Sequence, residues 1–212
     1  MELFRELSKY TSYPIAHQVL VSLLKGYKRP NDKIQDLLSK KILIPIKRGL
    51  YITGPVLEGQ SPEPILIANI LSGPSYVSMT YALSHYGWIP EKVYEVSSVT
   101  IKVSKIFKNE LGIFTYTKLP LPYYSFGITQ LKIRDDQYAL MASAEKALCD
   151  TVINTKGVNL RSKNEASRFL FEDLRIDKGM LKDANTAAIK SWLPYAPKGS
   201  SLNFLLKVIE EL

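Results

Sequence analysis

The stretch NDKIQDLLSKKILIPIKRGLYITG, residues 31–54, decides the fold that we expect for the N-terminal part of the chain. Its first half begins with Asn31, a favourable helix N-cap, and apolar side chains then recur at helical spacing. The stripe that such a helix would bury consists of Ile34, Leu37 and Leu38, continued by Lys41. The first half of the stretch therefore predicts an amphipathic helix.

Two short β-type runs follow, over residues 42–46 and 50–53. Gly49 lies between them and allows the positive φ of a tight turn, while Lys47 and Arg48 place two cations at its tip. The second half of the stretch therefore predicts a basic β-hairpin.

Two more helices are expected upstream of this stretch. The first covers residues 2–9, and the second runs over 15–24 with Ser12 as its cap and Gly26 at its end. Three helices followed by a hairpin are typical of a winged helix-turn-helix. In that DNA-binding arrangement the last helix enters the major groove.

The exposed face of the third helix carries side chains that suit the reading of bases. Lys can pair with guanine, Gln with adenine, and a hydroxyl group with either. The residues expected in the major groove are Lys33, Gln35, Ser39 and Lys40, and those expected on phosphates are Arg29, Lys47 and Arg48. Asp36 lies on the same face and counts against this hypothesis, because phosphate repels a carboxylate.

Positive charge is concentrated in the same part of the chain. Residues 1–54 carry ten Lys and Arg against four Asp and Glu, so they hold +6 of the net charge of +8 of the 212-residue chain. This asymmetry favours an anionic partner, and nucleic acid is the commonest one. A basic surface that only aids solubility is the alternative interpretation.

Residues 55–64, PVLEGQSPEP, predict a linker because Pro and Gly are frequent in them. Residues 65–212 then predict a larger mixed α/β domain, which makes the whole chain α+β. Helices are expected over 65–71, 78–86, 143–154, 165–173, 183–191 and 202–212, and strands over 98–103, 113–117, 129–133 and 137–141. In the first of these strands, we expect Val99, Ile101 and Val103 to face the core.

Composition excludes several classes of protein. One cysteine, Cys149, cannot form an internal disulfide, and with only His17 and His85 it cannot build a Cys/His zinc site. No window approaches the roughly 18 apolar residues of a membrane span, and charges interrupt the N-terminus where a signal peptide would be apolar. We therefore expect a cytoplasmic protein without a metal or cofactor.

No arrangement of reactive side chains predicts an enzyme. Glu145 and Asp150 would point about 140° apart on a helix, so they cannot act as an acid–base pair. Glu145 is explained by the helix dipole, since it lies in the first turn. Cys149 has no histidine near it in the sequence and is expected to be a small buried residue. Asp135-Asp136 predicts a turn rather than a metal site.

Two groups of aromatic residues are candidates for stacking on single-stranded bases. They are Tyr76, Tyr81, Tyr86 and Trp88 in one segment, and Tyr116, Tyr123, Tyr124 and Phe126 in another. Neither segment interleaves these rings with basic residues. Core packing or a protein-facing surface is therefore expected rather than an RNA platform.

The order of these segments resembles the antitoxins of the abortive-infection AbiE type, which belong to type IV toxin–antitoxin systems. The matching stretches are ILIPIKRGLYIT at 42–53, PSYVSMTYALSHYGWIP at 74–90 and ASAEKALCDTVI at 142–153, within residues 12–155. The resemblance implies a winged helix that represses its own operon at inverted repeats, followed by an antitoxin domain. It also implies a functional partner, a nucleotidyltransferase-like toxin that the antitoxin opposes without a required direct contact.

Two alternatives from other functional classes stay open. In the first, the chain is a non-catalytic interaction module whose basic N-terminal part binds RNA or an acidic protein. In the second, it is a nuclease that a winged helix directs to DNA. Sequence-dependent affinity for duplex DNA argues against the first, and metal-dependent cleavage would support the second.

Overall fold

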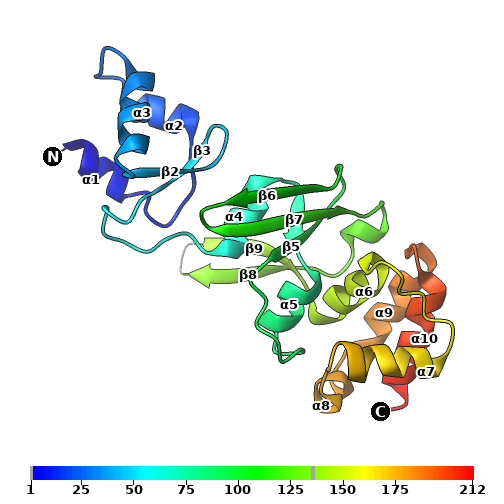
Figure 1. The fold of residues 1–212 in the computed structure, drawn as a ribbon. Helices are drawn as coiled ribbons and strands as arrows, with labels where there is room; N and C mark the ends of the chain where they lie inside the picture. Colours follow the sequence, from blue (N-terminus) through cyan, green and yellow to red (C-terminus); the bar gives the residue numbers. More distant parts are fainter. Residues whose placement is uncertain (1, 135–136) are drawn as a thin grey trace.

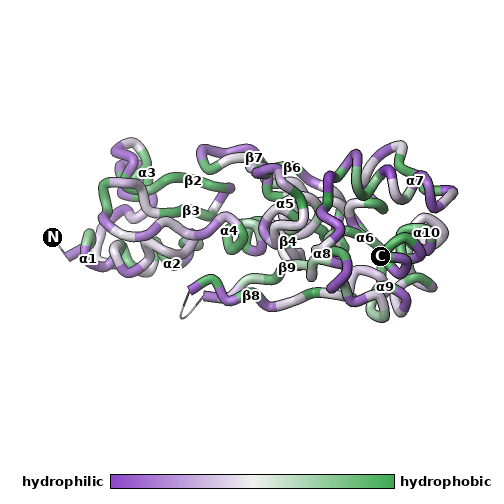
Figure 2. Tube along the Cα trace, turned by 90° about the horizontal axis from the view of Figure 1, so that it is seen from below, coloured by the Kyte–Doolittle hydropathy of each residue, from purple (hydrophilic) through white to green (hydrophobic). Residues whose placement is uncertain are grey.

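A computed structural model describes residues 2–134 and 137–212, so the expected turn at Asp135-Asp136 lies outside the described residues. Helices and strands both occur along the chain, and the expected α+β class is confirmed (Figure 1). The described strands form one three-stranded and one six-stranded sheet. The molecule is elongated, with its two ends far apart in both views (Figures 1 and 2).

Residues 2–54, here called the N-terminal unit, contain three helices and the smaller sheet. Their elements are α1 (Glu2–Ser8), β1 (Ile15–Ala16), α2 (His17–Leu23), α3 (Pro30–Ser39), β2 (Leu43–Lys47) and β3 (Leu50–Thr53). β3 lies between β1 and β2 and is antiparallel to both. Both faces of β3 are buried, because Tyr51 packs among the three helices while Leu50 and Ile52 join the central core.

The second and third helices differ from the expectation at their starts. The helix expected over 15–24 begins only at His17, because Ile15 and Ala16 pair with the edge of β3 instead. Backbone pairing within a sheet has here overridden the helical pattern of the local sequence. α3 takes Pro30 as its first residue and Arg29 as its N-cap, so Asn31 lies inside the helix.

The six-stranded sheet forms the middle of the molecule. In chain order its strands are β4 (Ser75–Val77), β5 (Val96–Thr100), β6 (Lys105–Asn109), β7 (Gly112–Lys118), β8 (Ile128–Arg134) and β9 (Gln137–Ala142). In space their order is β6-β7-β5-β4-β9-β8. The β5–β7 and β4–β9 pairs are parallel, and the others are antiparallel.

Helices cover both faces of this sheet. On one face lies α4 (Pro64–Leu71), where the Tyr116 hydroxyl donates to the backbone oxygen of Ala68 at 2.5 Å. On the other face lie α5 (Met79–His85) and α6 (Ala144–Asn154). There the Tyr76 hydroxyl donates to Asp150 at 3.0 Å. The core is therefore a sheet packed between helices.

The strand expected over 98–103 ends early. Val99 is fully buried as expected, but Ile101 and Val103 are 36% and 71% exposed, so the expectation for these two residues is wrong. Thr100 explains the difference, because its hydroxyl donates to the Pro74 oxygen and accepts from the Lys102 amide. These bonds turn the chain out of the sheet toward β6.

The remaining expected strands and the helices near the C-terminus are confirmed with shifted bounds. Ser143 caps α6 as expected, since its side chain accepts from the Lys146 amide. Beyond α6 the chain forms α7 (Lys163–Arg168), a π-helical turn (Phe169–Asp173), α8 (Lys178–Lys182), α9 (Thr186–Trp192) and α10 (Gly199–Glu210). Lys198 joins this group to the end of α6 and the loop after it, because its ammonium donates to the backbone oxygens of Val152, Thr155 and Val158.

Residues 55–63 connect the N-terminal unit to α4 as turns and irregular coil. Leu57 is buried among the three N-terminal helices, so the segment follows their surface. Within the described residues, no helix has the length and apolar character needed to cross a membrane.

Candidate nucleic-acid interface

α3 lies at one end of the molecule, away from the central sheet (Figure 1). It buries Ile34 and Leu37 against the other helices, which confirms that part of the expected stripe. Lys41 follows the helix with a left-handed backbone, φ 52°, and its side chain is exposed. The face opposite Ile34 and Leu37 is open to solvent.

Asp36 is the centre of that exposed face. Its carboxylate accepts hydrogen bonds from Lys33 at 2.6 Å and from Lys40 at 2.7 Å. Ser39 donates its hydroxyl hydrogen to the backbone oxygen of the same residue at 2.8 Å. Three of the four expected base-reading residues are therefore held by Asp36.

The two groups that bond at 2.6 Å shift each other's pKa. The hydrogen bond from Lys33 holds the pKa of the Asp36 carboxyl below its usual range, and the same bond raises the pKa of Lys33. Both groups therefore stay charged near neutral pH. One carboxylate between two ammonium groups leaves this cluster with a net charge of +1.

Gln35 and Arg29 are more accessible. Gln35 is exposed and forms no hydrogen bond with the described residues, so both the oxygen and the nitrogen of its side-chain amide are free to pair with a base. Arg29 has a side chain that is 78% exposed and lies 3.6 Å from Asp32. Exposed ion pairs of this length are weak, so the guanidinium can exchange Asp32 for a phosphate.

The other two expected phosphate contacts, Lys47 and Arg48, lie side by side at the turn between β2 and β3 but have different surroundings. Lys47 donates to the backbone oxygen of Leu71, the last residue of α4, at 2.8 Å. Arg48 is exposed and has no side-chain partner among the described residues. The structure thus brings Arg48 to the surface, whereas Lys47 joins the N-terminal unit to the central part.

Sequence reasoning missed that the β6–β7 turn lies beside this hairpin. The Asn109 side chain donates to the backbone oxygen of Ile46 at 3.1 Å. Lys108, Lys47 and Arg48 line one groove of about 490 Å³ between the two turns. A contact between segments about sixty positions apart leaves no local pattern, so nothing in the sequence pointed to it.

A second polar cluster is buried between β4 and α6. Lys146 donates to Asp150 at 2.5 Å and to the Tyr76 hydroxyl at 2.7 Å, and all of these side chains are buried. Asp150 also accepts from Ser78 at 2.7 Å. The ammonium of Lys146 lies 3.9 Å from the centre of the Tyr123 ring, where a cation–π interaction adds to the pairing. Desolvation lowers the pKa of Lys146, and the Asp150 carboxylate opposes that shift.

The reactive side chains considered in the sequence analysis have separate surroundings. Glu145 accepts from the backbone amide of Asn185 at 3.0 Å, whereas Asp150 pairs with Lys146 in the core. Cys149 is fully buried, as expected, and burial raises the pKa of its thiol. Among the described residues, no group of three His, Cys, Asp or Glu side chains could hold a metal ion.

Core packing is confirmed for most of the aromatic residues. Those with no more than 9% exposure are Tyr76, Trp88, Tyr116, Tyr123 and Tyr124. Their rings cannot stack on a base, because a stacking platform has to be open to solvent.

No protein-family model matches the chain, and no curated protein matches it either.

Proposed function

We propose that this chain is a DNA-binding regulator whose N-terminal unit is a winged helix-turn-helix. In this proposal α3 enters the major groove, and the β2–β3 hairpin is the wing. The observation that carries it is the exposed face of α3, which holds Gln35 free and two lysines in fixed positions at one end of the molecule. The charge of residues 1–54, +6 of the total +8, supports the same interpretation.

The resemblance to AbiE-type antitoxins suggests the role of the regulator in the cell, and we include that role in the proposal. The chain would repress its own operon at inverted repeats and, in the cytoplasm, oppose a nucleotidyltransferase-like toxin. Residues 65–212 would carry the antitoxin role. Co-expression tests this part directly, because growth arrested by the toxin of the same operon should recover when this chain is produced.

DNA binding is tested by fluorescence anisotropy at two salt concentrations. The duplex upstream of the gene is compared with a scrambled duplex of equal length. A preference of about 10³ or more for the upstream duplex supports the regulator. Equal and steeply salt-sensitive binding to both would contradict it, and would favour the interaction module that binds RNA or an acidic protein.

Gln35→Ala is expected to relax base preference at one position of the site. Loss of a bidentate amide–adenine contact costs roughly 1–3 kcal/mol against the correct base, while affinity for random DNA stays the same. The measurement is anisotropy with a set of single-base variants of the upstream duplex. Gln60→Ala, in the exposed connecting segment, is the matched control. If specific and random DNA weaken together, Gln35 does not read a base.

Asp36→Asn is expected to raise the affinity for all duplexes several-fold. The change removes a negative charge from the groove-facing side and releases Lys33 and Lys40 for phosphates. Asp173→Asn is the control, since Asp173 is exposed in the π-helical turn near the C-terminus, away from α3. A fall in affinity would mean that Asp36 is needed to position the two lysines.

Arg48→Ala and Lys47→Ala are expected to act differently although the residues are neighbours. Arg48→Ala should weaken binding to all sequences and lower the slope of log affinity against log salt by about one. Lys47→Ala should leave most of that slope, because its ammonium already binds the Leu71 oxygen. Equal slopes for Arg48→Ala and the unchanged protein would show that Arg48 of the hairpin does not contact DNA phosphates.

A further inference from the structure

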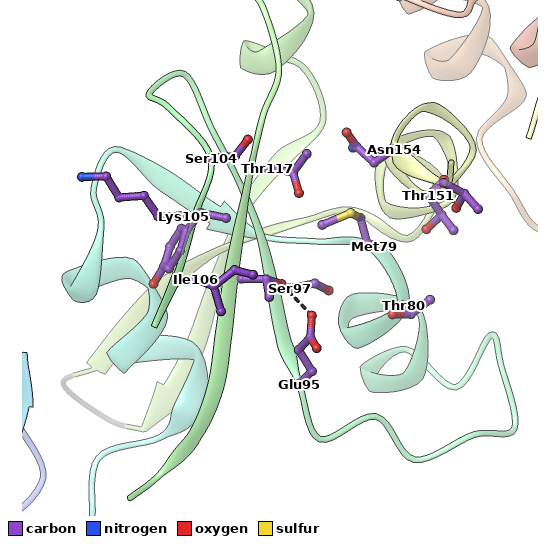
Figure 3. A pocket seen from close by; sticks show the side chains of 13 residues that line it. Met79, Thr80, Glu95, Ser97, Ser104, Lys105, Ile106, Thr117, Thr151 and Asn154 are labelled. Atoms are coloured by element: carbon purple, nitrogen blue, oxygen red, sulfur yellow. Dashed lines mark hydrogen bonds between the residues drawn. The ribbon is translucent and has the colours of Figure 1, made fainter. Parts of the chain in front are cut away.

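A pocket of about 560 Å³ lies on the α5–α6 face of the central sheet (Figure 3). Its walls come from β5, β6, β7, the start of α5 and the C-terminal half of α6. Most of the side chains that line it are polar. The apolar side chains on this face are those of Met79 and Ile106; Tyr116 borders the pocket through its backbone, because its ring points to α4 on the opposite face.

Two hydroxyl groups on the sheet side, those of Thr115 and Ser97, have already donated their hydrogens. Thr115 donates to the Glu95 carboxylate at 2.9 Å, the bond drawn in Figure 3. Ser97 donates to the backbone oxygen of Ser78 at 2.8 Å. What these groups still offer to the pocket is oxygen lone pairs.

The α6 side shows the same pattern. Thr151 donates to the Ala147 oxygen at 2.7 Å, and Thr155 donates to the Thr151 oxygen at 2.6 Å. Asn154 donates through its side-chain nitrogen to the Asp150 oxygen at 2.9 Å, which leaves its side-chain oxygen as an acceptor. These five side chains, two on the sheet wall and three on the α6 wall, therefore offer mainly acceptors to a ligand.

The charges of the lining also favour a cation over an anion. Glu95 keeps one carboxylate oxygen without a partner among the described residues. Lys105 is the cation of the lining, and its side chain is turned outward, away from Glu95 (Figure 3). A bound anion would therefore meet the Glu95 charge with no inward cation to balance it, whereas a bound cation would be stabilised.

We propose that this pocket binds an organic cation, a primary amine or a guanidinium group. The Glu95 carboxylate is the counter-ion, and the oxygens of Thr151, Thr155 and Asn154 accept its remaining hydrogens. Met79 lies at this wall in a left-handed backbone conformation, φ 55°, and supplies an apolar contact for the methylene part of the ligand. Such a group can belong to a free small molecule or to an Arg or Lys side chain of a partner protein.

The test uses the full chain and isothermal titration calorimetry. Agmatine is the free cation, the blocked peptide acetyl-Gly-Arg-Gly-amide presents the same group on a chain, and citrate is the anion. We expect both cations to bind and citrate not to bind. Glu95→Gln should weaken the cations tenfold or more, since it removes a charge-assisted hydrogen bond while the amide oxygen can still accept from Thr115. Glu210→Gln, at the exposed last residue of α10, is the control and should change nothing.

The two arms separate the sources of the cation. Tighter binding of agmatine assigns the pocket to a free small molecule, and tighter binding of the peptide assigns it to a partner's basic side chain. Either result supports the site. Three results would overturn it: no binding of either cation up to about 10 mM, equal affinities for Glu95→Gln and the unchanged protein, or binding of citrate as tight as that of agmatine. A circular-dichroism melt of Glu95→Gln confirms that the variant is folded.

Discussion

Lys146→Ala should lower the free energy of unfolding by about 3–5 kcal/mol, the range observed when one partner of a buried ion pair is removed. The variant leaves the Asp150 carboxylate inside the core, where the Tyr76 and Ser78 hydroxyl groups donate to it but no cation balances its charge. The measurement is urea unfolding followed by circular dichroism, with the midpoint and the slope fitted together.

Two further variants make this prediction specific. Lys163→Ala breaks an exposed pair with Glu211 and should cost no more than about 1 kcal/mol. The double change Lys146→Met with Asp150→Leu should recover most of the loss, because apolar side chains replace both charges together. If Lys146→Ala costs no more than Lys163→Ala, the buried pair does not stabilise the fold in the way described.

Gly54→Ala should destabilise the N-terminal unit by about 3 kcal/mol or more and reduce DNA binding with it. An added Cβ would lie 1.8 Å from the backbone oxygen of Lys41, and the Gly54 amide already donates to Ile42 at 2.8 Å. The corner where the chain passes from α3 into the small sheet would have to open.

Gly26→Ala is the matched control for this substitution. Its added Cβ meets no atom within 4 Å, so the change should be nearly neutral. Both variants are compared by urea unfolding and by anisotropy with the upstream duplex. Equal stability of the two would show that the corner adapts without cost.

Local sequence patterns correctly predicted the elements that are determined by residues close together in the chain. The buried stripe of α3, the Ser143 cap and the three later strands of the central sheet were all predicted, because each depends on residues within one turn or one strand. β1 was missed, since its two residues are extended only through pairing with Leu50 and Tyr51 of β3. The burial of Lys146 was missed for a similar reason, because Tyr76 lies seventy positions away.

In the candidate interface, too, some features could be predicted from the local sequence and others could not. The exposure of Gln35 followed from the helical stripe. The pairing of Asp36 with Lys33 and Lys40 was not predicted, although side chains three and four positions apart meet on a helix and the signal was present. The partner of Lys47 lies in α4 and could be found only in three dimensions.

The β6–β7 hairpin contacts two separate sites: the pocket on the central sheet and the β2–β3 hairpin of the N-terminal unit. Ile106 of β6 lines the cation pocket, and Asn109 at the end of the same strand holds the Ile46 oxygen beside Arg48. A shift of this one hairpin would therefore change both places. Thermodynamic linkage then requires reciprocity: if an occupied pocket changes the affinity for DNA by some factor, bound DNA changes the affinity of the pocket by the same factor. Measuring either factor therefore gives the coupling free energy between the two ends of the hairpin.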